Sequence, residues 1–250
     1  GVLESRLGEA NSNYNALSAK LTQRFSRGLT YMVSYTWSKA IDDSSAIRQS
    51  TNDYFGTLNT YDTGPERGLS AYNVNNRLSA SGVYELPFGR GKAHLNHGGI
   101  VDAAVGGWQV GSVLTLASGI PTSVSTIPWN GDSGTIRPDA TGVSSIPDNR
   151  STSQFWNLKA FNWTDPGLLY RRGNVARNTL TGAGTSLWDF SAVKNFRVTE
   201  KHTLQFRFEA FNFLNHANYT FGQDANLNLA FDAAGKVSNP NFGLATNKIG

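Results

Sequence analysis

The sequence has no cysteine, so it can form neither a disulfide framework nor a cysteine metal site. It also lacks any apolar run that approaches the ~18 residues of a membrane-spanning helix. Its net charge of +4 is spread along the chain without a long basic run, so we do not expect a nucleic-acid partner. One membrane architecture stays open, because the strands of a membrane barrel are only ~9–11 residues long and half polar.

Glycine and aromatic residues are plentiful in a chain that is otherwise poor in charge. The 250 residues include 26 glycines and 12% aromatics, against 16% charged residues. This balance favours many strands and turns over long helices. The length fits one large β domain or two small ones. Since the chain begins at Gly1 and has no signal-like segment, we expect it to be a piece of a longer precursor.

Period-two alternation of apolar and polar residues is clearest between residues 187 and 218. Trp188 and Phe190 fall on one face of a predicted strand, and Asp189 falls on the other. A polar turn at 199–202 leads into a second strand with the same alternation. Such a sheet has one strongly apolar face and one charged face, which suits either a sandwich or the wall of a membrane barrel.

Four earlier strands show the same alternation, and the connections between strands vary regularly in length. In chain order the connections are short, long, moderate, long, short and long. Alternate connections of an antiparallel meander lie at the same end of the sheet, so all the long ones are expected at one end. Outer-membrane barrels have this asymmetry, with short periplasmic turns and long extracellular loops. The further strands are predicted at 14–25, 29–40, 77–86 and 108–118, a seventh begins near Phe242, and the long connections are 42–76, 119–186 and 219–245.

The sequence therefore predicts an all-β fold, an antiparallel up-and-down meander of six to seven strands that forms part of a transmembrane β-barrel. All of residues 1–250 are expected to belong to that one barrel domain. The alternative is a soluble sandwich with aromatic core faces. A bacterial membrane barrel has at least ~8 strands, and open sheet edges do not occur in lipid, so the remaining strands are expected outside this sequence.

One lysine tests this assignment of the two faces. Lys194 lies on the apolar row, where a charge at the middle of the bilayer would cost ~2–4 kcal/mol. Because Lys194 is near the end of its strand, we expect its ammonium group to reach the membrane interface while its stem lies along lipid. Lys39 is expected to do the same at the opposite rim.

Several sequence stretches resemble the C-terminal barrel of TonB-dependent outer-membrane receptors, and most closely the Oar-like subgroup, which carries an N-terminal carboxypeptidase-regulatory-like domain. The resemblance spans nearly the whole chain, in order. The stretches are YMVSYTWSKAID at 31–42, ERGLS at 66–70, YELPFGRGK at 84–92, GGWQV at 106–110, SGIP at 118–121, WDFSAVKNF at 188–196 and RFEAFNFLNH at 207–216.

The resemblance implies a 22-stranded barrel that is plugged by an N-terminal globular domain. A periplasmic energy-transducing protein, TonB, would pull on that plug through a short N-terminal box. The plug, the box and the final strand are expected outside this sequence. The implied partners are outer-membrane lipid, the protein's own plug and remaining barrel strands, the TonB complex, and a small-molecule, oligosaccharide or peptide substrate. The implied location is the bacterial outer membrane.

No catalytic constellation stands out, so we expect neither an enzyme nor a cofactor. A metal site could be formed by His94 and His97, or by Asp42, Asp43 and Asp53. The favoured interpretation is that these are solvated turn and loop residues. The best candidates for substrate binding are aromatic and arginine side chains of the long loops, since aromatics stack on sugars and arginine pairs with anions. They are Tyr54, Tyr61, Trp129, Trp156, Trp163, Arg171 and Arg172, with Phe55, Phe161 and Tyr170 nearby.

The competing interpretation of these loop residues is that they pack the loops onto one another. Three functions follow from the sequence. The first is the wall of an energy-dependent transporter that captures substrate with its long loops. The second is a soluble or cell-surface carbohydrate-binding β domain. The third, an outer-membrane enzyme, ranks last because no nucleophile and base are paired in the sequence.

Overall fold

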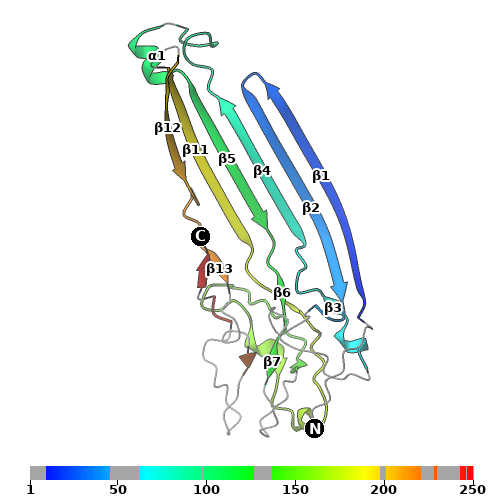
Figure 1. Cartoon of the computed structure of the whole chain (residues 1–250). Helices are drawn as coiled ribbons and strands as arrows, with labels where there is room; N and C mark the ends of the chain where they lie inside the picture. Colours follow the sequence, from blue (N-terminus) through cyan, green and yellow to red (C-terminus); the bar gives the residue numbers. More distant parts are fainter. Residues whose placement is uncertain are drawn as a thin grey trace.

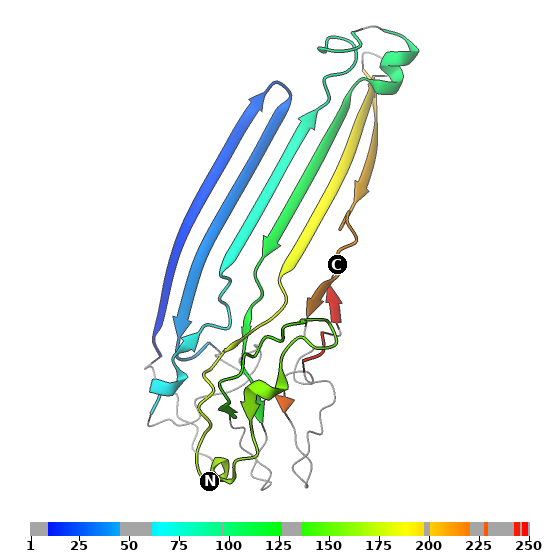
Figure 2. The same ribbon diagram turned by 180° about the vertical axis from the view of Figure 1, so that it is seen from behind.

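The computed structural model describes residues 10–45, 62–96, 98–126, 137–197, 201–220, 228–229, 243–245 and 247–249. Six long strands form one antiparallel sheet in which every strand lies beside its predecessor among the six (Figures 1 and 2). This confirms the predicted meander. The strands are β1 (Ser12–Ser26), β2 (Leu29–Asp42), β4 (Asn76–Glu85), β5 (Trp108–Ala117), β11 (Thr185–Arg197) and β12 (Thr203–Ala210), and the short β3 (Gly68–Leu69) pairs with the end of β2.

The connections separate by length as predicted. A two-residue turn at Arg27 and Gly28 joins β1 to β2, with positive φ angles of 51° and 83°. Gly28 is required there, because a Cβ atom would lie 2.9 Å from the backbone oxygen of Glu85. The connection from β4 to β5 lies at this same end and carries the helix α1 (Ile100–Val105) (Figure 1). The long connections gather at the other end of the sheet (Figures 1 and 2).

Strand register aligns the apolar residues into one face and the polar residues into the other. Leu78 on β4 pairs with Tyr35 on β2 and with Leu116 on β5. The next residue, Ser79, pairs with Ser34 and Thr115 on the opposite face. We call these the apolar face and the polar face. The apolar face includes Leu17, Leu21, Val33, Tyr35, Trp37, Leu78, Leu114, Leu116, Trp188, Phe190, Phe206 and Phe208.

The apolar face is not covered by another layer among the described residues. Leu17 is 66% exposed, Leu21 59% and Phe206 51%. A sandwich would bury this face against a second sheet. The exposed apolar face and the charged and hydroxylated opposite face instead match a barrel wall between lipid and a wet lumen.

Lys194 lies on the apolar face near the short-connection end, as the sequence predicts, but its ammonium group does not reach water. The side chain is 2% exposed. Its Nζ donates hydrogen bonds to the backbone oxygens of Ala104, at 3.2 Å, and Gly106, in the last turn of α1 and just beyond it. Nζ also lies over the rings of Trp108 and Phe196, 5.4 and 4.9 Å from their centroids. The negative end of a helix dipole thus compensates the buried charge.

Smaller elements lie among the long connections. None of the helices in the described ranges has the length and hydropathy to cross a membrane. The predicted seventh strand near Phe242 falls outside the described residues. The remaining elements are η1 (Gly64–Glu66), β6 (Pro121–Thr122), β7 (Ser125–Thr126), β8 (Asp139–Ala140), η2 (Leu158–Ala160), β9 (Phe161–Asn162), η3 (Pro166–Leu169), β10 (Leu180–Thr181), β13 (Asn218–Thr220), β14 (Asn228–Leu229) and β15 (Asn247–Ile249).

Candidate functional site

The long connections form a packed unit at one end of the sheet. We call the described residues 62–75, 118–126 and 137–184 the loop assembly. Short antiparallel pairs fix its backbone, β6 with β10 and β8 with β9. Its hydrophobic core consists of Val124, Trp156, Ala160, Phe161, Val175 and Leu180, with Phe155, Leu158 and Trp163 packed against it.

Arg177 ties the first long connection to the second and to the end of β2. Its side chain is buried and forms an ion pair with the carboxylate of Asp42. It also donates from Nε to the backbone oxygen of Glu66, at 2.7 Å, and from Nη1 to Ser45 Oγ, at 3.1 Å. The next residue, Asn178, donates from Nδ2 to the backbone oxygen of Leu69 at 2.6 Å. One dipeptide therefore joins segments more than a hundred residues apart in sequence.

We call these contacts of Arg177 and Asn178 with the first long connection and the end of β2 the Arg177 junction. A second buried ion pair supports it. Glu66 is 1% exposed and pairs with Arg137, which is 3% exposed. Arg137 also donates from Nη1 to the backbone oxygen of Pro65 at 3.2 Å. Removing one partner of such a pair leaves an uncompensated buried charge, which is far more costly than losing an exposed pair. The two pairs therefore fix how the two long connections sit on each other.

Gly68 explains why the ERGLS stretch can lie so close to Arg177. A Cβ atom at this position would be 2.7 Å from the backbone oxygen of Arg177, a distance that backbone cannot relax cheaply. The neighbouring residues of this stretch differ in burial. Glu66 and Ser70 are buried, whereas the side chain of Arg67 is exposed.

Surface ion pairs hold the outer part of the loop assembly. Arg171 bridges two carboxylates, with Nη2 2.6 Å from Asp139 Oδ2 and 2.5 Å from Asp165 Oδ2. These hydrogen bonds from Arg171 hold the pKa of Asp139 below its ordinary value and raise the pKa of Arg171 itself. Arg172 pairs with Asp62 at 2.6 Å. Both arginines that the sequence singled out are thus engaged in the loop assembly.

The structure separates the predicted aromatic residues by exposure. Trp156 is 2% exposed and packs edge-to-face on Phe155, with centroids 5.3 Å apart, so its ring is unavailable for stacking on a ligand. Trp163 packs against the same core. Tyr170, beside the two arginines, is 91% exposed. Tyr54, Tyr61 and Trp129 lie outside the described residues, as do Phe55, His97 and Asp53.

Trp156 and Trp163 are therefore packed into the loop assembly, whereas the side chain of Tyr170 is open to a ligand. Sequence reasoning missed the four buried charges at the junction, Asp42, Glu66, Arg137 and Arg177. Glu66 lies in the ERGLS stretch, whereas no local pattern marks Arg137 or Arg177 as buried. Within the described ranges, no three potential metal ligands of the His, Asp and Glu types come together.

The sheet and its loops together define the class of the protein. An antiparallel meander with one apolar face, one polar face and its long loops at one end is the wall of an outer-membrane type of β-barrel. The chain belongs to the outer membrane beta barrel domain family, which it matches over residues 1–250. No curated protein and no solved structure gives a significant match.

Family membership places the protein in the bacterial outer membrane, where lipid contacts the apolar face. It sets aside the soluble sandwich. Because barrels of this type have short periplasmic turns and long extracellular loops, the loop assembly lies on the extracellular side and α1 on the periplasmic side.

Proposed function

We propose that this chain is part of the barrel of a TonB-dependent transporter, and that its loop assembly forms part of the extracellular surface that captures substrate. The observation that carries the proposal is the buried Arg177 junction, which locks two long connections into one unit above the barrel wall. Loops held in one conformation lose less entropy when a ligand binds, which favours selective capture.

Within the described residues, the exposed Tyr170 and the adjacent Arg171 are the best candidates for contacting cargo. Tyrosine offers a rigid ring for stacking on a sugar or another flat group. Arg171 already forms ion pairs with two carboxylates. Its charge is therefore used to position the loop, which disfavours a role in capturing a strongly anionic cargo. The cargo class that this supports is a neutral oligosaccharide or peptide. Tyr54, Tyr61 and Trp129 remain predictions from the sequence.

The experiment is an uptake assay in the native host with the gene deleted and restored. Candidate oligosaccharides, peptides and iron chelates are supplied one at a time, and uptake is followed in the restored strain with and without a functional TonB. We expect one cargo class to require both the gene and TonB. Uptake that needs the gene but persists without TonB would identify a passive channel instead.

We further propose that cargo passes through without covalent change. The charged clusters of the loop assembly consist of paired acids and arginines, an arrangement that holds structure rather than activates a nucleophile. Mass spectrometry of the periplasmic cargo tests this directly. Recovery of the cargo at an altered mass that depends on this gene would point to the enzyme hypothesis.

A further inference from the structure

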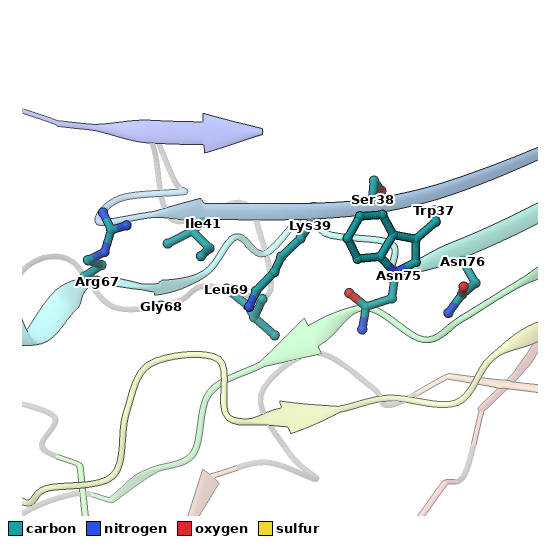
Figure 3. Close-up of a pocket in the computed structure, with 9 residues that line it drawn as sticks. All are labelled: Trp37, Ser38, Lys39, Ile41, Arg67, Gly68, Leu69, Asn75 and Asn76. Carbon is teal, nitrogen blue, oxygen red and sulfur yellow. The ribbon is translucent and has the colours of Figure 1, made fainter. Parts of the chain in front are cut away.

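A groove of about 640 Å³ lies where the extracellular end of β2 meets β3 and the start of β4 (Figure 3). Its walls come from strand residues of β2 and from the ERGLS stretch, which the buried Arg177 junction holds in place. The lining residues are Trp37, Ser38, Lys39, Ile41, Arg67, Gly68, Leu69, Asn75 and Asn76.

The groove is continuous with the lipid-contacting face of the barrel wall. Trp37, Lys39 and Ile41 alternate along β2 on the same side as Tyr35, which belongs to the apolar face. Ile41 on β2 pairs with Leu69 on β3, so both apolar side chains lie on this same face. Trp37 is 47% exposed at the rim, where membrane barrels carry aromatic girdles. An occupant of the groove would therefore meet lipid rather than the lumen.

Lys39 and Arg67 differ from four arginines of the loop assembly. Arg137, Arg171, Arg172 and Arg177 all form ion pairs. Lys39 and Arg67 are exposed in the groove, and no acidic side chain among the described residues pairs with either. This is the combination that an anionic headgroup would complete.

Two asparagines add hydrogen-bond donors to the groove. The side-chain oxygen of Asn75 accepts from Asn73 Nδ2 at 2.7 Å, and that of Asn76 accepts from the Tyr35 hydroxyl at 2.7 Å. Their oxygens are thereby occupied and their NH₂ groups are available as donors. The groove thus offers cations and amide donors above an apolar floor of Trp37, Ile41 and Leu69.

We propose that this groove binds a phosphorylated lipid of the outer leaflet, with its phosphate between Lys39 and Arg67 and its acyl chains along the apolar face. Lysine and arginine both suit phosphate, and a basic pocket beside a membrane surface selects anionic headgroups. This inference depends on the barrel family and its orientation, and not on the transport function.

The test uses the full-length protein that carries this chain, purified in detergent. It is titrated with phosphatidic acid, with diacylglycerol of the same acyl chains, and with inorganic phosphate, and bound ligand is counted by native mass spectrometry. We expect phosphatidic acid to bind most tightly of the three. The variant Lys39→Gln/Arg67→Gln should weaken phosphatidic acid binding roughly 30-fold, because each of the two substitutions removes one favourable interaction between a cation and the anionic headgroup.

The matched control is Lys20→Gln/Arg77→Gln, which removes the same charge from exposed positions on the polar face of neighbouring strands. Its binding should stay within about twofold of the unaltered protein. An equal loss in both double variants would mean that net charge, and not the groove, attracts the lipid. Equally tight binding of inorganic phosphate would assign the groove to a free anion. If the groove variant does not fold, phosphatidic acid that binds no more tightly than diacylglycerol to the unaltered protein overturns the proposal.

Discussion

The barrel wall and the loop assembly place the same residue types in opposite environments. Leu21 in the wall is 59% exposed, whereas Leu180 in the loop assembly is 1% exposed. The contrast extends to charge, since Lys20 and Arg207 on the polar face of the wall are exposed whereas Arg177 is buried in an ion pair. The wall is inverted relative to a soluble protein, and the loop assembly is not.

The difference shows that two sources of stability act within one chain. The wall relies on its ladder of backbone hydrogen bonds and on lipid, which solvates apolar side chains as well as a protein core does. The loop assembly faces water, so it must bury its own core and satisfy its own charges. The effect of a substitution should therefore depend more on the region than on the residue type.

The largest expected effect comes from breaking the Arg177 junction. Arg177→Met should cost about 3–5 kcal/mol in the loop assembly, because Asp42 would be left as an unpaired buried charge. Since the chain has no cysteine, Val175→Cys, at a position 4% exposed, provides a unique reporter in this chain. Its rate of thiol labelling should rise at least about 100-fold in the Arg177→Met background.

The control for this prediction is Arg90→Met, which alters an exposed arginine in the turn at the periplasmic end. Labelling of the same reporter should be unchanged. A small effect of Arg177→Met would show that the loop assembly does not depend on this ion pair and would weaken the case for a preorganised capture surface.

A matched pair of leucines tests the comparison most directly. Leu180→Ala should cost about 2–5 kcal/mol in the stability of the loop assembly, because it opens a cavity in a packed core. Leu21→Ala should cost within about 0.5 kcal/mol, since lipid can fill the space that the side chain leaves. Urea unfolding of the detergent-solubilised protein, followed by loop labelling and by β-sheet circular dichroism, separates the two. Equal costs would contradict the difference between the regions.

The sequence predicts the wall much better than the loop assembly. Alternation of residues such as Trp188 and Asp189 reports directly which side of a strand faces lipid, so six strands and their faces follow from local pattern. The lengths of the connections then predict which end of the sheet carries the long loops and which carries the short turns. Both kinds of information are local, which is why the expected strand limits differ from the observed ones by only a few residues.

The loop assembly depends on contacts between distant residues, which no periodicity encodes. Arg177 meets Asp42 across a separation of 135 residues. Composition cannot tell a buried loop ring such as Trp156 from an exposed one such as Tyr170. The same limit hid α1, whose six residues are too few for a helical pattern and which also covers Lys194.

Lys194 is a residue of the barrel wall that resembles the buried charges of the loop assembly. Its charge is buried, and backbone carbonyl groups accept its hydrogen bonds. Lys194→Met should keep the strand in place, because methionine suits the apolar face, but it should release the last turn of α1. We expect a loss of about 0.3–2 kcal/mol, the range for a cation at a helix C-terminus. Hydrogen exchange of residues 100–107 measures it, and Lys201→Met, at an exposed position before β12, is the control. Unchanged exchange would show that other contacts hold α1, such as the hydrogen bonds from Trp108 Nε1 to Ala104 and from the Arg90 backbone N–H to Asp102.

The smallest expected effect is a dependence of the loop assembly on acid. Hydrogen bonds from Arg171 lower the pKa of Asp139 from its ordinary 3.8, so the stabilisation is complete above that value and is lost as the pH falls through the lowered pKa. Near-ultraviolet circular dichroism of the loop tryptophans should therefore be constant from about pH 7 to 5 and decline only below about pH 4. Asp139→Asn should reduce this acid-dependent change, whereas Asp148→Asn, at an exposed loop position, should retain it. An acid transition that is the same in both variants would assign the sensitivity to other carboxylates and leave Arg171 without a measurable part in holding the loops.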